Sequence, residues 1–149
     1  MVMKPLDTIS LKEGNVVVTV GSATFDIAEI KECEATVNFS TVEVQAMGAR
    51  MPGEKVVGMK GEGKMKIYGQ NPILRKRAEE YLKTGRILDV SVKGTMDDAT
   101  SSAGRQTVLL KGIVVKSAKL FQLSTEDGVF EDETDFTFND FEILEHFKK

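Results

Sequence analysis

The sequence predicts a mainly β fold, a β-sandwich or small barrel of about seven to eight strands with one flanking α-helix. Apolar and polar residues alternate with a period of two along most of the chain, as in half-buried strands. Glycines and short polar stretches separate these segments, and a helical period is confined to one place. At 149 residues the chain is expected to form one domain, residues 1–149, with enough length to bury a core.

The expected strands are short, and two of them contain a shift of one residue in the alternation. Odd-numbered residues are apolar from Cys33 to Phe39, whereas even-numbered residues are apolar from Val42 onward. Because side chains on a strand alternate faces, this shift predicts a bulge or a tight turn near Ser40 and Thr41. A similar shift lies within the last expected strand. The expected strands are residues 15–20, 24–30, 33–46, 61–68, 86–92, 107–116, 118–123 and 134–144.

One helix is expected at about residues 72–84. Asn71 is suited to cap it, Pro72 to occupy its first position and Gly85 to end it. An apolar stripe is expected to face the sheet, formed by Leu74, Ala78, Tyr81 and Leu82, while Arg75, Lys76, Arg77, Glu79, Glu80 and Lys83 stay outside. The run of three basic residues in this segment lacks accompanying aromatics, which favours a solvated helix face over a nucleic-acid patch.

The stretch GMKGEGKM, residues 58–65, resembles a phosphate-binding loop. Gly58, Gly63 and Lys64 match the pattern, but Met65 stands where a magnesium-binding hydroxyl is needed. The following residues alternate as a strand rather than opening a helix, and such a loop requires that helix. The glycines are therefore expected to permit close contact with a neighbouring strand.

Two long connections are expected, at residues 45–63 and 94–106. The second is small and polar throughout, whereas the first carries Met47, Met51 and Met59. Loops longer than about 12 to 15 residues are usually functional or disordered. Apolar side chains in a solvent loop are unfavourable unless something covers them, and methionine adapts its shape to a partner. The first connection is therefore expected to bind another molecule.

Charge is unevenly distributed along the chain. Residues 1–119 carry 18 basic and 14 acidic side chains, whereas residues 120–149 carry two lysines and nine acidic side chains. This acidic segment is either a solvated edge or a surface that repels polyanions or attracts a basic partner.

Few residues suit catalysis, metal binding or membrane insertion. The chain has one cysteine, Cys33, expected to be buried, and one histidine, His146, close to the end, so a zinc site and a Cys–His pair are not expected. No cofactor is expected. The N-terminus lacks an apolar signal core, and no apolar run approaches the length of about twenty residues needed to span a bilayer, so no membrane anchor is expected.

The serial order of these features resembles the tail tube proteins of contractile-tailed phages and of PBSX-like defective prophages. The likeness runs from DTISLKEG (residues 7–14) through GEGKMKIYG (61–69), the helix and SSAGRQTVLLKG (101–112) to FTFNDFEIL (136–144). It implies a structural, non-enzymatic subunit that forms hexameric rings, which stack into a tube within a sheath and conduct DNA. It further implies contact with tail sheath, tape measure and baseplate or terminator proteins. The location implied is the virion tail, after folding in the bacterial host cytoplasm.

The resemblance also suggests which residues meet other molecules. It implies that a protruding hairpin loop at about residues 45–60 reaches an adjoining ring and that the channel is acidic, with DNA passing through without sequence-specific binding. The implied contact residues are Gln45, Ala46, Met47, Gly48, Ala49, Arg50, Met51, Pro52, Gly53, Glu54, Lys55, Val56, Val57 and Met59. The candidate acidic residues for the lumen or a partner are Glu131, Asp132, Glu133 and Asp135.

Other functions stay open on the sequence. The same fold serves as the tube of related contractile injection or secretion systems. A hydrolase using two of the carboxylates among residues 131–135 is a further alternative, because paired carboxylates perform acid–base chemistry when their pKa values differ. A calcium site is another, although residues 126–135 lack the ligand spacing of a calcium loop.

Overall fold

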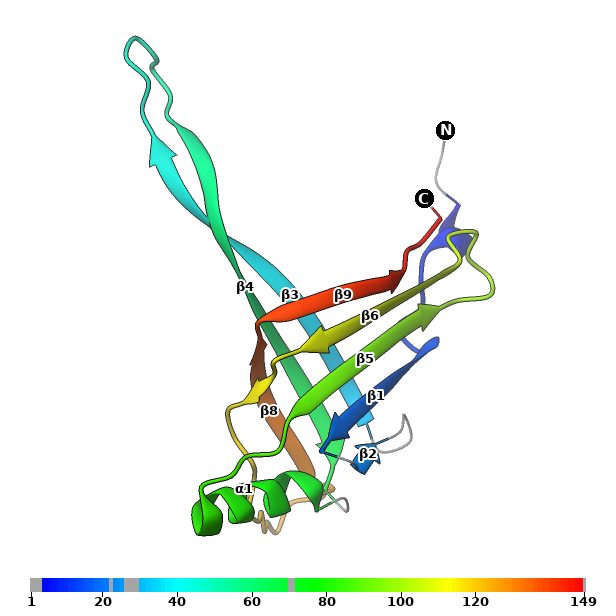
Figure 1. Cartoon of the computed structure of the whole chain (residues 1–149). Helices are drawn as coiled ribbons and strands as arrows, with labels where there is room; N and C mark the ends of the chain where they lie inside the picture. Colours follow the sequence, from blue (N-terminus) through cyan, green and yellow to red (C-terminus); the bar gives the residue numbers. More distant parts are fainter. Residues whose placement is uncertain (1–3, 22, 26–29, 70–71, 149) are drawn as a thin grey trace.

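In the computed structural model, residues 4–21, 23–25, 30–69 and 72–148 are described. They form two antiparallel sheets that pack against each other, with one helix at one end and a long hairpin that projects from the other (Figure 1). The mainly β fold with one helix agrees with the expected class. The elements in chain order are the 3₁₀ turn η1 (Pro5–Asp7), β1 (Gly14–Val20), β2 (Ala23–Phe25), β3 (Ile30–Val44), β4 (Gly53–Tyr68), α1 (Ile73–Thr84), β5 (Val90–Asp97), β6 (Arg105–Lys111), β7 (Val114–Val115), β8 (Glu131–Phe138) and β9 (Asp140–Glu145).

The five-stranded sheet has the order β2-β1-β5-β6-β9, and the four-stranded sheet has the order β3-β4-β8-β7. Their facing side chains, together with one residue of α1, form the core. Burial of these apolar side chains is the main stabilising contribution to such a fold. The core comprises Val18, Val20, Ile30, Met65, Ile67, Leu74, Val90, Val92, Leu110, Ile113, Phe136 and Phe138.

The two shifts in the alternation have different structural causes. At the first, Ser40 pairs with Gly58 and Thr41 with Val56, so the ladder has a bulge at the predicted place, with its extra residue, Val57, on β4 rather than on β3. At the second, the chain leaves the four-stranded sheet after β8 and enters the five-stranded sheet as β9. Asn139 forms this corner, and its backbone N–H donates to the Lys111 carbonyl at 3.3 Å.

A second corner lies beside the first and breaks the strand expected at residues 107–116. β6 ends at Lys111, and Gly112 adopts φ 65°, after which the short strand β7 belongs to the other sheet. A Cβ atom at Gly112 would overlap the Asn139 side chain, so the close approach of the two corners requires glycine there.

Both expected long connections are shorter than expected, because strands extend into them. β4 already begins at Gly53, so the first connection shortens to residues 45–52 and residues 53–60 extend the ladder. β5 continues to Asp97 and β6 begins at Arg105, which shortens the second connection to residues 98–104. Expected strand residues 26–29 lie outside the described residues.

The strand expected at residues 118–123 is absent. Lys116 N–H donates to the Asp135 carbonyl, but the next amides bind side chains of β8 rather than its backbone: Ser117 N–H donates to Thr134 Oγ1 at 3.3 Å and Lys119 N–H to Asp132 Oδ1 at 3.2 Å. Polar side chains thus take the place of the ladder and end β7.

The face that helix α1 buries differs from the face that the amphipathic pattern predicted. Pro72 is the N-cap residue, Asn71 lies outside the described residues, and Gly85 ends the helix with φ 75°. Only Leu74 of the expected apolar stripe is buried, whereas Ala78, Tyr81 and Leu82 are exposed.

Arg77 of α1 was expected on the outside and is buried instead. Its Nε donates to the Leu88 carbonyl at 3.0 Å, which holds the segment after the helix and delays the start of β5 from the expected residue 86 to residue 90. Burial lowers the pKa of the Arg77 guanidinium from its ordinary value.

Candidate assembly interface

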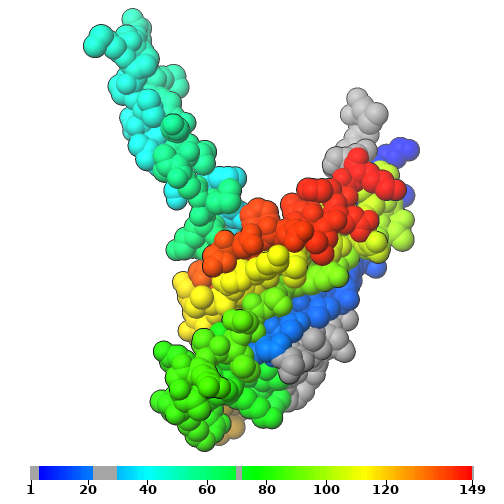
Figure 2. Space-filling model, viewed as in Figure 1, coloured from blue at the N-terminus to red at the C-terminus, as the bar shows by residue number. Residues whose placement is uncertain are grey.

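The hairpin formed by the outer parts of β3 and β4 is a slender column that stands away from the body (Figure 2). Every side chain from residue 38 to residue 60 is exposed, and we call this segment the arm. At its tip, Ala49 N–H donates to the Ala46 carbonyl, the Gln45 side chain donates to the Ala49 carbonyl at 3.0 Å, and Gly48 adopts φ 85°. The tip is therefore an ordered turn with a left-handed glycine.

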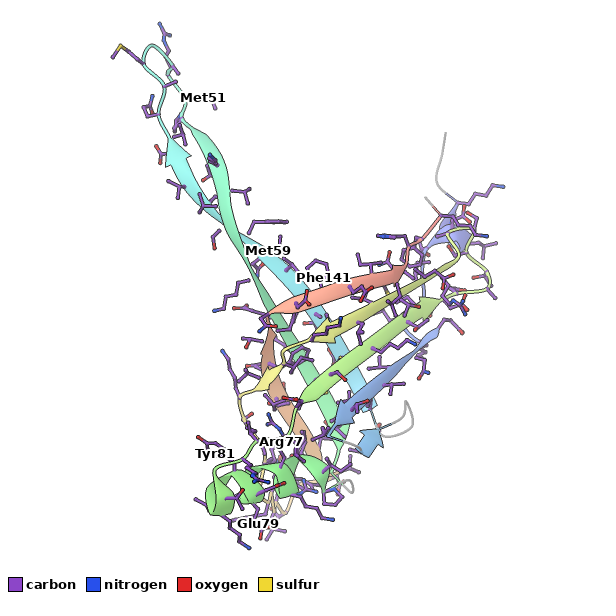
Figure 3. The ribbon with its side chains drawn as sticks, in the orientation of Figure 1. Met51, Met59, Arg77, Glu79, Tyr81 and Phe141 are labelled. Carbon is purple, nitrogen blue, oxygen red and sulfur yellow. The ribbon has the colours of Figure 1, made fainter. Side chains whose placement is uncertain are left out.

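The arm carries large apolar side chains that are exposed to solvent. Met47 and Met51 near the tip are 104% and 83% exposed, and Met59 lies where the arm leaves the body (Figure 3). A concentration of exposed apolar side chains on one segment is typical of a binding site on a protein. The exposed apolar residues of the arm are Phe39, Val42, Val44, Met47, Met51, Val56, Val57 and Met59.

The expected contact residues 45–59 all lie on the arm. Residues 45–52 form the tip, and the rest belong to the first part of β4. The β-ladder continues to the pair Val44–Gly53, so the side chains on the two strands have defined positions. Phe39, Val42 and Val44 are also exposed on the arm and were not among the expected residues; the period-two pattern that continues through β3 was the available signal.

Acidic side chains line the outward face of the four-stranded sheet. The ladder sets Glu133 opposite Lys66 and Lys66 opposite Glu32, with Nζ–carboxylate distances of 4.0 and 3.9 Å. The next row along the strands repeats the order with Asp135, Lys64 and Glu34. Each lysine therefore stands between two carboxylates.

Two further features shape this acidic face. Lys31 Nζ lies 2.7 Å from Glu131 Oε1, and this hydrogen bond holds the pKa of Glu131 below its ordinary value and raises the pKa of Lys31. A shallow groove of about 380 Å³ runs over the face, lined in part by Glu34, Glu62 and Asp135. The face is acid-rich but partly neutralised by lysines that the sequence alone did not place there.

Asp132 does not share this face. It is 2% exposed, because it alternates with Glu131 and Glu133 and points into the molecule. Its Oδ2 accepts a hydrogen bond of 2.6 Å from the Arg75 guanidinium. The expectation that Asp132 faces a lumen or a partner is therefore corrected: it anchors α1 to β8. A separation of 57 residues left no local signal for this pair.

The environment of Asp132 also bears on the hydrolase alternative. Its carboxylate is bonded to Arg75 and to the Lys119 amide, and its carboxylate neighbours along β8 lie on the opposite face of the sheet. Asp132 is thus separated from Glu131 and Glu133, which share the outward face with Asp135. Among the described residues, no group of three or more His, Cys, Asp and Glu side chains is arranged to hold a metal ion.

The glycines of the stretch 58–65 lie in the middle of β4 and not in a loop before a helix. Gly61 pairs with Phe138 and Gly63 with Phe136, and the two phenyl rings lie over the glycines. A Cβ atom at Gly63 would overlap the Phe136 ring and approach the Glu34 carbonyl oxygen at 2.6 Å. The glycines therefore make room for core aromatics.

Cys33 and His146 lie on different elements. Cys33 on β3 is half-buried against the core, and burial raises the pKa of its thiol to about 11. A thiol with this pKa is protonated at neutral pH and is a poor nucleophile. His146 follows β9 and is exposed.

Comparison with known proteins identifies the family. A family model described as "Phage tail tube protein" matches residues 1–145. The chain belongs to the phage tail tube protein family. It is 33% identical over 145 residues to the phage-like element PBSX protein XkdM of Bacillus subtilis strain 168, with 97% of this chain and 96% of that protein covered. It is 34% identical over 148 residues to the uncharacterized protein YqbM of the same strain, covering 99% and 98% of the two chains.

The fold of this tail tube protein also occurs in particles that contract. A chain of the sixfold-symmetrised anti-feeding prophage baseplate superposes with a TM-score of 0.67 at 14% identity, covering 96% of this chain and 97% of that one. A chain of an extracellular contractile injection system sheath–tube complex gives 0.65 at 9% identity, with 92% and 91% covered. At these identities the likeness concerns the fold. No helix in the described part of the tail tube protein is long and apolar enough to cross a bilayer.

Proposed function

We propose that this tail tube protein is the repeating subunit of a contractile phage tail, and that its copies form rings of six that stack into a conduit for DNA. The exposed arm carries this proposal, because its apolar side chains need a cover that the same chain does not provide. The family and the 33% identical PBSX protein favour a phage-type tail over an injection or secretion tube. Residues 1–149 would act as one tail-tube domain without catalytic activity.

Unpaired edges of the two sheets favour ring formation. β2 and β9 are the edges of one sheet, and β3 and β7 those of the other, so each presents unpaired backbone groups. Pairing between neighbouring copies removes such edges, and closed rings remove them completely. The sixfold symmetry of the anti-feeding prophage baseplate and of the gene transfer agent tail supports six copies.

The acid-rich face of the four-stranded sheet is proposed to line the conduit, with Glu131, Glu133 and Asp135 contributed by each copy. Carboxylates repel the phosphate backbone, whereas each phosphate neutralised by a basic side chain adds affinity and slows passage. The lysines between the carboxylates partly neutralise this face.

The partners proposed are further copies of the chain, the tail sheath around the tube, and the tape measure, baseplate and terminator proteins at its ends. The structural neighbours come from a sheath–tube complex, a baseplate and a tube terminator, which supports the sheath, baseplate and terminator proteins as partners. The protein would fold in the host cytoplasm and reside afterwards in the tail of the particle.

The arm is tested by measuring assembly of the full chain against concentration, using sedimentation and negative-stain electron microscopy. The parent protein is expected to form tubes, and the double substitution Met47→Ser with Met51→Ser is expected to prevent stacking. Met96→Ser serves as the control, because Met96 is an exposed methionine on the body. A parent protein that stays monomeric at all concentrations would contradict the proposal.

The conduit face is tested by charge reversal in assembled tubes. Glu133→Lys with Asp135→Lys is expected to retain DNA that nuclease does not digest, with retention decreasing as salt increases. Glu79→Lys with Glu80→Lys on α1 is the matched control. Equal DNA retention by the two double variants would mean that the acidic face does not line the conduit. Retained DNA that nuclease digests would place this face on the outside of the tube.

A further inference from the structure

The segment between residues 120 and 130 is another apolar surface that the described part of the chain leaves uncovered, and we call it the basal loop. It joins the end of the 116–119 segment to β8 and contains no regular strand or helix. Leu123 is 90% exposed, and Leu120, Phe121 and Val129 are each at least 70% exposed. Single exposed apolar side chains are normal on a monomer, but a group of four on one short loop is not.

The basal loop is firmly held at its end. The Phe130 carbonyl accepts a hydrogen bond of 2.8 Å from Gly69 N–H, and the Arg75 guanidinium lies 5.1 Å from the centre of the Phe130 ring. Gly69 directly follows β4, so this end of the loop is fixed to the end of β4 and to the start of α1. These contacts fix the position of this end of the basal loop relative to β4 and α1.

The arm tip and the basal loop lie at opposite ends of the molecule. The tip precedes β4 and the loop is attached just after it, and β4 contains 16 residues. At about 3.3 Å per residue the two ends of the strand are about 50 Å apart. Figure 1 shows the tip at the far end of the arm, remote from α1. A tip therefore reaches a basal loop only on another copy.

The two surfaces are complementary in chemistry. Arg50 is the only charged residue of the tip, residues 45–52, whereas the basal loop carries Glu126 and Asp127 and no basic residue. The loop surrounds a hollow of about 270 Å³ lined by Leu123, Val129 and Phe130 among others, with Glu126 and Asp127 beside them. A hollow that combines these apolar side chains with two acids suits a methionine that has an arginine next to it.

We propose that the basal loop of one copy receives the arm tip of a copy in the next ring, with Met47 and Met51 on its apolar residues and Arg50 facing Glu126 and Asp127. The proposal rests on the tube function above and names the surface that receives the arm. Two tips, or two basal loops, would meet with like charges. The contact is therefore head-to-tail, and such heterologous contacts extend without limit along one direction.

Directed disulfide formation tests this pairing in assembled tubes. The background is Cys33→Ser, which leaves no native thiol. A chain that carries both Met51→Cys and Leu123→Cys is expected to give a ladder of cross-linked oligomers on oxidation. Each single variant alone is expected to stay uncross-linked, and an oxidised mixture of the two is expected to give dimers only. The control pair is Met51→Cys with Leu11→Cys, which places the second thiol at another fully exposed leucine.

The outcomes separate the inference from the function it rests on. Absence of tubes from the parent protein would contradict the tube function itself. Tubes without the ladder, or a ladder with Leu11→Cys in place of Leu123→Cys, would overturn the receiving surface and leave the tube intact. If the cysteine variants do not assemble, charge reversal decides: Arg50→Glu is expected to lose assembly, and addition of Glu126→Lys with Asp127→Lys to restore it. Failure to restore assembly would overturn the pairing.

Discussion

The inner and outer halves of the β3–β4 hairpin are one continuous ladder with opposite surroundings. On the inner half, Met65 and Ile67 are fully buried between the sheets. On the outer half, Val56 and Met59 belong to the same strand and are more than half exposed. Strand pairing is therefore the same in both halves, whereas the chain itself covers the side chains of the inner half and leaves those of the outer half exposed.

This difference explains why the arm keeps its shape without a core. An isolated two-stranded hairpin is only marginally stable in water. Here the arm continues a register that is already set inside the body, where β4 pairs with both β3 and β8. The ordered body thus templates the arm, and the apolar side chains of the arm remain available for binding.

The largest expected difference between the two halves concerns aromatic residues. Phe136→Ala, at a buried ring that also covers Gly63, is expected to lower the free energy of unfolding by about 4 kcal/mol through lost burial and a cavity. Phe39→Ala on the arm is the control and is expected to have little effect on folding. Urea denaturation of the monomeric chain measures the free energy of unfolding of both variants. Equal losses would mean that the arm contributes to folding as much as the body does.

The buried ion pair is expected to have the next largest effect. Asp132→Ala removes the partner of Arg75 and the acceptor of the Lys119 amide, at an expected loss of about 3 kcal/mol. Glu145→Ala breaks an exposed pair with Arg105 and is expected to change unfolding much less. A small loss for Asp132→Ala would mean that α1 is held to β8 by its apolar contacts alone.

The glycines of β4 provide a smaller and more local comparison. Gly63→Ala forces a methyl group against the Phe136 ring, and the expected loss is about 2 kcal/mol. Gly58→Ala on the arm meets only the Ser40 Cβ at 4.0 Å and is expected to be tolerated. Thermal unfolding measures Tm for both variants. An equal decrease in Tm would mean that Gly58 is as closely packed as Gly63, and that the packed half of the hairpin extends into the arm.

The smallest expected effect on folding comes from the tip. Met47→Ser with Met51→Ser is expected to leave the unfolding curve of the monomer indistinguishable from that of the parent, because both side chains are already in solvent. The same variant is expected to lose assembly. A clear loss of monomer stability would show that the tip contributes to the fold of its own chain.

Sequence patterns predicted the parts of this fold that depend on near neighbours. The alternation around Cys33 and Phe39 reveals a strand, and the shift at Ser40 reveals a bulge, because facing along a strand depends on position alone. The helix and its end at Gly85 follow from local preferences. The uncovered methionines were also apparent, since nothing in their surroundings resembles a core pattern.

Contacts between distant segments overruled other sequence expectations. Arg77 is buried because the Leu88 carbonyl accepts its hydrogen bond, although the pattern of α1 favoured an exposed position. Residues 118–123 alternate like a strand, but side chains of β8 bind the preceding amides. Facing with a period of two, counted back from Phe136 and Phe138, places Asp132 inward and Glu131 outward, but the expected strand began only at residue 134, so this signal was missed.

By itself, the sequence determined the mainly β class, the single helix, the irregularity near Ser40 and the apolar residues of the arm, because each depends on residue type and spacing within one segment. Only the tertiary structure decided that β6 and β8 change sheets at adjacent corners, that Asp132 pairs with Arg75, and that the arm tip and the basal loop lie at opposite ends of β4. These features depend on which segments meet in space, and the cooperative packing of the two sheets determines those meetings.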